Sequence, residues 1–312
     1  MSHIEIPIVS IICYAYNHEK YIREALDGFV TQQTNFSFEI VIHDDASTDN
    51  TALVIKEYEL KFPHLFKPIY QKENQYSKEK GRVTRICYEA AKGKYIALCE
   101  GDDYWTDSLK LQKQVDFLEN NSHYSFCFHD ALQVHEDTSK NFVRIGSRKI
   151  DAVVDLKSVI IENNFPTSSL LFHKKFYVLK RDDLSATAKG DYILVLRLVE
   201  RGLGKYLPEV MSAYRLHEGG VWSSKSKYYK LEEDVKFYDL LYAYFEDSSI
   251  RKVIVQKRNK TKQSQSLNAM RSGEFIKGLL GWLAHFNFTA DPRLSSSPRK
   301  VLSAMKEGFG KL

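Results

Sequence analysis

The sequence predicts an α/β fold, in which a sheet is flanked by helices and followed by a helical, basic C-terminal region. Short apolar runs of strand length alternate with segments of helical periodicity from residue 9 onward, and the turns between them are short. Two of the predicted strands end in paired acids, and positive charge is concentrated beyond Lys225. The alternation favours a parallel, doubly wound sheet with right-handed crossovers.

Four strand–helix pairs fill the first part of the chain. Asn17 is placed to cap the first helix, and Ser47 and Asp49 open the second. The predicted strands cover residues 9–14, 38–43, 67–71 and 95–99, and the predicted helices cover residues 19–32, 47–62, 84–91 and 108–120.

The second part is less regular. Strands are predicted at residues 124–128, at residues 168–173 and from Leu207 toward His217, and a helix is predicted from Asp191 to Gly202. Residues 135–150 look like a polar excursion or a hairpin at the sheet edge. We therefore predict an α/β domain at residues 1–224 and a helical, basic region at residues 225–312.

Length and composition favour a soluble, cytoplasmic protein. The 312 residues are 43% hydrophobic, enough for one large domain with an appendage. The N-terminus lacks the basic and then apolar pattern of a secretory signal, and no uninterrupted apolar stretch is long enough to cross a bilayer. The four cysteines show no CxxC spacing, so we expect reduced core residues without a zinc site or disulfide framework.

The positive charge belongs to the C-terminal region. From Lys225 onward 17 lysines and arginines oppose 9 acids, whereas the preceding residues carry 28 against 31. A partly amphipathic helix there could lie at the inner membrane face, although packing against the α/β domain or a second subunit in a homodimer is the simpler expectation. No helix-turn-helix, zinc or RNP pattern suggests nucleic acid. The helix would use Trp282, Leu283, Phe286 and Phe288, flanked by Lys277, Arg293, Arg299 and Lys300.

Acids follow two of the predicted strands directly. Asp44 and Asp45 end the second strand, and Glu100, Asp102 and Asp103 end the fourth. In open α/β sheets ligands bind beyond the carboxyl ends of the strands, where carboxylates suit Mg²⁺ or Mn²⁺. For a nucleoside diphosphate, one pair could hydrogen-bond base and ribose while the other binds a cation that bridges the phosphates.

The acids also have a structural explanation. Carboxylates near a helix N-terminus contribute about 0.3–1 kcal/mol through the helix dipole, and Asp107 or Ser108 alone would suffice to cap the helix after the fourth strand. Three acids at one strand end exceed that need. The chain contains neither a GxxxxGK[ST] loop nor a GxGxxG after its first strand, so a phosphate held by acids and a metal remains.

Three motifs stand in a fixed order along the chain. They are Val9-Ser10-Ile11-Ile12 with Tyr16-Asn17, then residues 44–51, then Ala91-Lys92-Gly93-Lys94-Tyr95-Ile96 with Asp102-Asp103. Together with Asp191 and residues 214–223 they resemble the large family of inverting glycosyltransferases with the A-type nucleotide-diphospho-sugar fold (GT-A), over roughly the first two thirds of the chain. The resemblance implies a Rossmann-like mixed sheet flanked by helices. It also implies sugar transfer from a nucleotide-diphospho-sugar, with UDP favoured, to a glycan or lipid-linked acceptor of a bacterial capsule, lipopolysaccharide or exopolysaccharide.

The resemblance assigns the donor-binding residues one by one. Tyr16 corresponds to the aromatic side chain that stacks on the base, and Asp45, with Asp44 beside it, corresponds to the acid that binds the base or ribose. Asp102 corresponds to a contact with ribose or metal. Glu100 stands where the family often has the first Asp of its D-x-D motif, so a carboxylate with a longer reach replaces it.

The metal ligands and the catalytic base also follow from the resemblance. Asp103 corresponds to the principal ligand of Mn²⁺ or Mg²⁺, and His217 to a second ligand. Trp222, in a loop with paired glycines, could cover a bound diphosphate. Asp191 corresponds to the base that deprotonates the acceptor, although an aspartate before a helix is otherwise more often an N-cap.

Two departures from the family pattern stand out. Tyr14 occupies the position of a usual proline, and Arg85 that of a frequent asparagine. Arg85 could contact phosphate, although a solvated helix face is the simpler explanation. His129 and Asp130 end a predicted strand and could touch donor or acceptor.

The main competing hypothesis is a catalytically silent module that binds nucleotide sugars and assembles with partners through its basic tail. The presence of the acids, the base and the metal ligands together argues against a catalytically silent protein. A nucleotidyltransferase is disfavoured because no glycine-rich first loop with a basic residue is present to hold a triphosphate. Donor sugar, acceptor and linkage depend on loop contacts that show no pattern.

Overall fold

The computed structural model describes residues 6–135, 143–145, 152–162, 165–177, 189–220, 222 and 224–271. The chain divides into two compact units. Unit 1 comprises Met1–Lys180 and Gly190–Glu218, and unit 2 comprises Arg181–Lys189 and Gly219–Leu312. The predicted helix around Trp282 and its basic flanks lie outside the described residues, so membrane contact and homodimerisation stay predictions.

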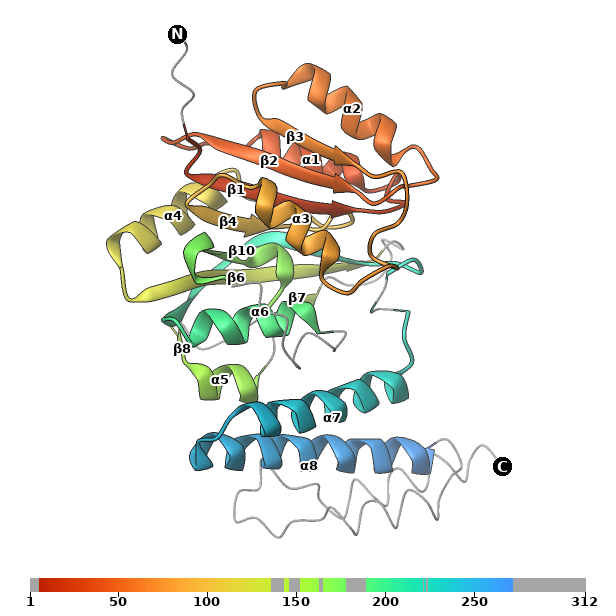
Figure 1. Cartoon of the computed structure of the whole chain (residues 1–312), viewed down its shortest axis with the longest axis vertical. Coiled ribbons are helices and arrows are strands. Elements are labelled where there is room, and N and C mark those ends of the chain that lie inside the picture. The colour runs from red at the N-terminus through yellow and green to blue at the C-terminus, as the bar shows by residue number, and fades with distance from the viewer. Residues whose placement is uncertain are drawn as a thin grey trace. The chain divides into compact units, whose positions relative to one another are not determined.

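Unit 1 is built on one ten-stranded sheet with the order β3-β2-β1-β4-β9-β6-β10-β5, with β7 paired to β6 and β8 to β10 (Figure 1). The strands β3, β2, β1 and β4 run parallel, whereas β9 is antiparallel to both β4 and β6. The mixed sheet that the resemblance implies is therefore confirmed, whereas the parallel sheet that the strand–helix alternation favoured is interrupted by the antiparallel strand β9. The strands are β1 Val9–Ala15, β2 Phe38–Asp44, β3 Phe66–Tyr70, β4 Tyr95–Leu98, β5 Tyr104–Trp105, β6 Tyr124–His135, β7 Val143–Ile145, β8 Val153–Val154, β9 Leu171–His173 and β10 Leu203–Leu216.

Helices flank this sheet, as the alternating pattern predicted (Figure 1). Apolar residues of β1, β2, β4 and α1 are buried and form a core cluster together with residues of α4. The helices of unit 1 are α1 Ile22–Val30, α2 Thr51–Lys61, α3 Arg82–Ala90, α4 Lys110–Asn120, α5 Leu156–Ile161 and α6 Gly190–Val199.

Unit 2 contains two long helices that lie side by side, α7 Lys227–Tyr244 and α8 Ser248–Arg271 (Figure 1). Ser226 caps α7, because its hydroxyl accepts a hydrogen bond from the backbone N–H of Tyr229 at 3.2 Å. The predicted helical character beyond Lys225 is confirmed for these residues. No helix in the described part of the chain is long and apolar enough to cross a membrane.

The first helix begins later than predicted, and Asn17 does not cap it. Helix α1 starts at Ile22, and Tyr21 precedes it without a side-chain cap. Asn17 has a φ of 56°, in the left-handed region that asparagine tolerates. Its side-chain oxygen instead accepts a hydrogen bond at 2.8 Å from the N–H of Thr48, in the loop after β2. Asn17 therefore ties together the loops that follow two neighbouring strands.

The two acidic strand ends are not on adjacent strands of the sheet. Strand β1 lies between β2 and β4, pairing with both in parallel. Asp44 and Asp45 are therefore separated from Asp102 and Asp103 by the width of one strand. A ligand that contacts both acidic pairs must extend across the end of β1, where Tyr16 follows.

A buried lysine supports the short strand β5, which follows the second acidic pair. Lys110 is fully buried, and its Nζ donates a hydrogen bond to Gln114 Oε1 at 2.7 Å. The same Nζ lies 4.0 Å from the centroid of the Trp105 ring. The Trp105 indole N–H donates to the carbonyl oxygen of Ser168 at 2.9 Å. Burial lowers the pKa of Lys110 from 10.5 to about 7.

We expect this lysine to make stability depend on pH. Between pH 7 and about 10.5 the unfolded chain binds more protons at Lys110 than the folded chain does, so the free energy of unfolding should rise with pH in that window, by at most about 1.4 kcal/mol per pH unit. Urea unfolding at pH 7, 8 and 9 should show a smaller rise for Lys110→Met and an unchanged rise for the exposed-site control Lys56→Met. Identical rises in all three proteins would contradict the prediction.

Candidate active site

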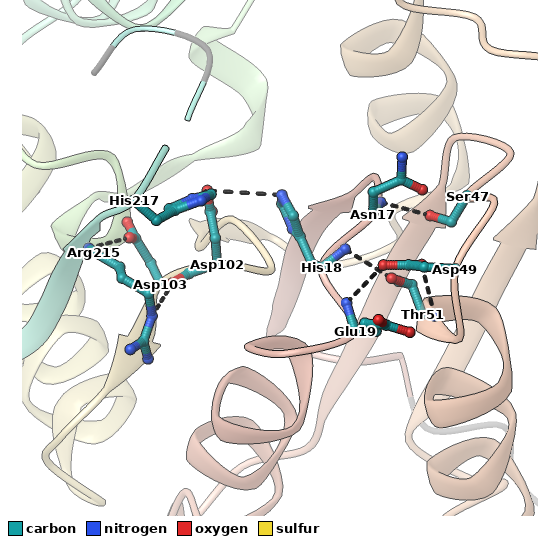
Figure 2. Close-up of polar contacts among 10 residues, drawn as sticks. All are labelled: Asn17, His18, Glu19, Ser47, Asp49, Thr51, Asp102, Asp103, Arg215 and His217. Atoms are coloured by element: carbon teal, nitrogen blue, oxygen red, sulfur yellow. Dashed lines mark hydrogen bonds and ion pairs between the residues drawn. The ribbon is translucent and has the colours of Figure 1, made fainter. Parts of the chain in front are cut away.

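Asp102 lies between two histidines at the carboxyl edge of the sheet (Figure 2). Its Oδ2 lies 3.0 Å from Nε2 of His217, which follows β10, and 3.7 Å from Nε2 of His18, which follows β1. Burial favours the protonated carboxyl, yet the hydrogen bond with His217 and the charge of His18 keep the pKa of Asp102 below its usual value. Burial lowers the pKa of His18.

Asp103 is held by the backbone of β10. Its Oδ1 accepts a hydrogen bond at 2.9 Å from the N–H of Arg215 (Figure 2). Its Oδ2 is buried and has no hydrogen-bond partner among the described residues. Burial, followed by the charges of Asp102 and Glu100, raises the pKa of Asp103 well above its usual range. A buried carboxylate oxygen without a partner is costly, which indicates that this site is completed by a ligand.

Arg215 joins helix α1 to the acidic turn, by which we mean residues 100–103 after β4. Its Nε donates to the carbonyl oxygen of Asp102 at 3.0 Å, and its terminal nitrogen forms an ion pair with Glu24 at 3.0 Å. The guanidinium carbon lies 5.0 Å from the ring centroid of Tyr21 and 5.2 Å from that of Tyr104. Three elements that are distant in sequence are thereby fixed around Asp102 and Asp103.

Close packing requires a glycine inside the acidic turn. A Cβ atom on Gly101 would lie 2.6 Å from Cδ1 of Ile22 and 2.9 Å from Nδ1 of His18. Any larger residue at this position would push His18 away from Asp102. The glycine between Glu100 and Asp102 is therefore needed for the arrangement of the two histidines.

Glu100 and Asp191 belong to the same electrostatic cluster. Burial, followed by the charges of Asp102 and Asp191, raises the pKa of Glu100 to about 8. Asp191 is exposed in the first turn of α6, and its Oδ1 accepts a hydrogen bond at 2.8 Å from the N–H of Tyr192. A solvent-accessible carboxylate on α6 therefore contributes to the negative charge that acts on Glu100.

Asp44 and Asp45 are buried beside β1 and have different surroundings. Asp44 Oδ1 has no hydrogen-bond partner among the described residues, and burial raises the pKa of Asp44. Asp45 accepts hydrogen bonds from the N–H groups of Gln75 at 2.7 Å and Tyr76 at 3.0 Å. Tyr16 lies at the same edge and is 45% exposed, so its ring is available to a ligand.

Trp222 belongs to unit 2, whereas the other predicted donor contacts belong to unit 1. The Nζ of Lys189 lies 4.9 Å from its ring centroid, and that of Lys230 lies 5.9 Å away. Both contacts fall within unit 2. The role of Trp222 over a bound diphosphate stays a prediction.

The structure also clarifies the weaker candidates. Arg85 forms an ion pair with Glu79 at 3.1 Å on α3. His129 and Asp130 are fully buried within β6, where Asp130 accepts a hydrogen bond from the Tyr206 hydroxyl at 2.6 Å. None of these contacts places them at the acidic turn.

Sequence analysis missed His18 and the roles of Arg215 and residues 75–76. His18 directly follows Asn17 in the first motif, but only the fold shows that it faces Asp102. Arg215 lies in β10 and precedes His217, which follows that strand, by two residues; in an extended backbone this spacing puts both side chains on one face. That spacing was the available indication.

The carboxylates of the acidic turn could bind a divalent cation, but they would supply only a few of its ligands. No group of three or more His, Cys, Asp or Glu side chains in the described ranges is arranged to hold a metal ion. Asp102 Oδ1 and Asp103 Oδ2 are nevertheless buried without hydrogen-bond partners in the same part of the chain. Mg²⁺ and Mn²⁺ sites that complete their coordination with substrate phosphates and water need only one or two carboxylates.

Comparison with known proteins identifies the family to which this chain belongs. Residues 10–164 match the family described as Glycosyl transferase family 2. The putative teichuronic acid biosynthesis glycosyltransferase TuaG of Bacillus subtilis is 33% identical over 71% of this chain and 84% of its own length. An uncharacterized protein of Mycobacterium tuberculosis is 40% identical over 69% of this chain, and the match spans 61% of that relative's length. This chain therefore belongs to glycosyl transferase family 2.

Solved structures show the same architecture. S. aureus TarS 1-349 in complex with UDP-GlcNAc has a TM-score of 0.64 at 17% identity, covering 89% of this chain and 79% of that one. The mannosyltransferase PcManGT from Pyrobaculum calidifontis, in complex with GDP-Man and Mn²⁺, has a TM-score of 0.64 at 14% identity, covering 99% of this chain and 82% of that one. The predicted GT-A fold is confirmed.

Proposed function

We propose that this protein is a metal-dependent inverting glycosyltransferase that moves a sugar from a nucleotide-diphospho-sugar, with UDP as the favoured nucleotide, to a glycan or lipid-linked acceptor. The observation that carries the proposal is the pair of buried, unpartnered carboxylate oxygens on Asp102 and Asp103 at the strand edge of a family 2 chain. A nucleoside diphosphate with its cation would satisfy both.

Asp103 and His217 would hold the cation, which supplies positive charge to the departing diphosphate. The chain's own residues do the rest. Arg215 fixes Asp103 through its backbone N–H, and His217 and His18 orient Asp102. Asp191 takes the proton from the acceptor hydroxyl, on the face of the sugar opposite the leaving group, as single displacement with inversion requires.

Relatives support a role in the synthesis of bacterial surface glycans. The Escherichia coli enzyme WfaP, named as UDP-Glc:alpha-D-GlcNAc-diphosphoundecaprenol beta-1,3-glucosyltransferase, is 27% identical over 70% of this chain and 82% of its own length. TuaG is named for teichuronic acid biosynthesis. By analogy, we propose that this chain uses a hexosyl or N-acetylhexosaminyl donor and a lipid-linked or glycan acceptor.

Incubation with a panel of UDP- and GDP-sugars and Mn²⁺, with and without diphosphoundecaprenol-linked acceptors, tests the proposal. Release of nucleoside diphosphate from one donor, dependent on added acceptor, is the expected result. Donor binding without turnover for any acceptor would favour a catalytically silent binding module. Absence of both binding and turnover would contradict the proposal.

His217 provides a more specific prediction for the cation. Replacing His217 by Ala should weaken Mn²⁺ binding in the presence of UDP by about 10- to 100-fold, because it removes a proposed ligand of the cation. Mn²⁺ titration followed by electron paramagnetic resonance measures the effect. The exposed His64, replaced by Ala, serves as control and should leave the affinity unchanged; equal affinities in both variants would exclude His217 from the cation site.

A further inference from the structure

The loop between β3 and α3 is fastened to the carboxyl end of β2. The N–H of Gln71 donates to the carbonyl oxygen of Asp44 at 3.0 Å. The N–H groups of Gln75 and Tyr76 donate to Oδ1 and Oδ2 of Asp45 at 2.7 and 3.0 Å. The Asp45 side chain therefore fixes the position of the loop as well as facing the predicted donor site.

The loop is built to hold this conformation. Gln75 is only 7% exposed, and its side-chain amide donates to the carbonyl oxygen of Glu73 at 2.6 Å. The side-chain oxygen of Asn74 accepts a hydrogen bond at 2.8 Å from the N–H of Ser77. These bonds fix the backbone on both sides of Tyr76.

Tyr76 nevertheless presents its side chain to solvent. It is 61% exposed, and Tyr16 is 45% exposed, whereas Asp45 is only 4% exposed. The N–H of Asp45 donates to the carbonyl oxygen of Ala15 at 2.9 Å, which puts Tyr16 one residue from that contact. Two exposed aromatic residues thus lie close in the chain to contacts of Asp45: the Tyr76 N–H bonds its carboxylate directly, and Tyr16 follows the residue that accepts its backbone N–H.

This arrangement suits a flat ligand with an N–H edge. Aromatic side chains stack on nucleobases whatever the sequence of the base, and a carboxylate accepts hydrogen bonds from ring N–H groups. A carboxylate has about four acceptor positions, of which the loop uses two in Asp45. Single exposed tyrosines are common on protein surfaces, but a rigid backbone that displays one beside a buried acid is not explained by chance exposure.

We propose that Tyr76 is a second aromatic contact for the nucleobase of the donor, and that Asp45 acts both as acceptor for the base and as anchor of the loop that carries Tyr76. This inference rests on the proposed function, and it adds a residue that the resemblance does not assign. Tyr76 would then contribute to the choice and retention of the nucleotide.

Calorimetric titration of the full chain with UDP and with GDP, in the presence of Mn²⁺, tests the role of Tyr76. Tyr76→Ala should raise the dissociation constant of the preferred nucleotide about tenfold, and Tyr76→Phe should bind like the wild type because the ring is kept. Leu60→Ala is the control, since Leu60 is 75% exposed near the end of α2 that lies away from the acidic strand ends. Equal affinity in Tyr76→Ala and wild type would overturn this inference alone. A wild type that binds neither nucleotide would overturn the proposed function.

Limited trypsin digestion tests the anchor. Lys78 and Lys80 are exposed cleavage sites in the loop. Nucleotide should slow cleavage there severalfold in the wild type and much less in Tyr76→Ala. Asp45→Asn should be cleaved faster than the wild type even without ligand, because an amide has one acceptor oxygen for the two N–H groups. A loop equally resistant in Asp45→Asn would show that the carboxylate does not anchor it.

Discussion

Replacing Asp103 by Asn should lower the turnover of the preferred donor by a hundredfold or more and abolish the protein's response to Mn²⁺. Asparagine keeps the shape of the side chain and the acceptor for the Arg215 N–H, but it removes the charge at the buried Oδ2 position. Steady-state kinetics and Mn²⁺ titration of the same preparation measure both effects. The wild type treated with EDTA should be equally slow.

A measurement of the free energy of unfolding distinguishes a role of Asp103 in cation binding from a purely structural role. In the absence of metal, Asp103→Asn should be as stable as the wild type or more stable, because it removes a buried acid that Asp102 and Glu100 repel. Asp107→Asn is the matched control, since Asp107 follows the same turn and accepts a hydrogen bond from the Leu109 N–H at 2.8 Å. Normal turnover in Asp103→Asn, or full activity after EDTA treatment, would refute the assignment.

Replacing Asp191 by Asn should reduce sugar transfer by about a hundredfold or more while donor affinity stays within a factor of two or three. Asparagine can still accept the local hydrogen bond from the Tyr192 N–H, so the start of α6 should be preserved. It cannot accept a proton from the acceptor hydroxyl. Donor affinity by calorimetry and transfer rate by product release should be measured side by side.

Asp155 offers a matched control for the capping explanation. It caps α5, and its Oδ1 accepts a hydrogen bond from the Ser158 N–H at 2.8 Å. Asp155→Asn should transfer sugar at the normal rate, because asparagine caps helices as well as aspartate does. If Asp191→Asn also transferred sugar at the normal rate, Asp191 would only stabilise the start of α6 and another residue would be the base.

Local sequence pattern was sufficient to predict most of the first seven elements. Strands β1, β2 and β4 are buried on both faces, and each consists of an apolar run that stops at polar residues, so their ends could be predicted within one residue. The start of α1 could not be predicted with the same precision, because no capping side chain marks it. Asn17 appeared to be that cap and instead bonds across to Thr48, a contact that exists only after β1 and β2 pair.

The ends of longer elements were predicted wrongly where polar residues are buried inside them. Strand β6 was predicted to end at Phe128 but continues to His135, with Asp130 accommodated inside the sheet by a hydrogen bond that its Oδ2 accepts from the Tyr206 hydroxyl of β10. The same limitation hid part of the site. The position of His18 beside Asp102, and the dual contacts of Asp45, depend on which strand ends become neighbours, and the order β2-β1-β4 cannot be obtained from spacing along the chain.

The placement of β5 beside β10 has a consequence for how the protein matures. Within the described sheet β5 pairs only with β10, through Tyr104–Ala213 and Trp105–Ser212, and the Asp103–Arg215 bond joins residues 112 positions apart. Contacts of such long range form late, because the chain must first close a large loop. On the ribosome the acidic turn is made long before its partner strand emerges. If the proposed cation binds this site, it would stabilise only chains that have completed β10, and its binding would report that β10 has joined the sheet.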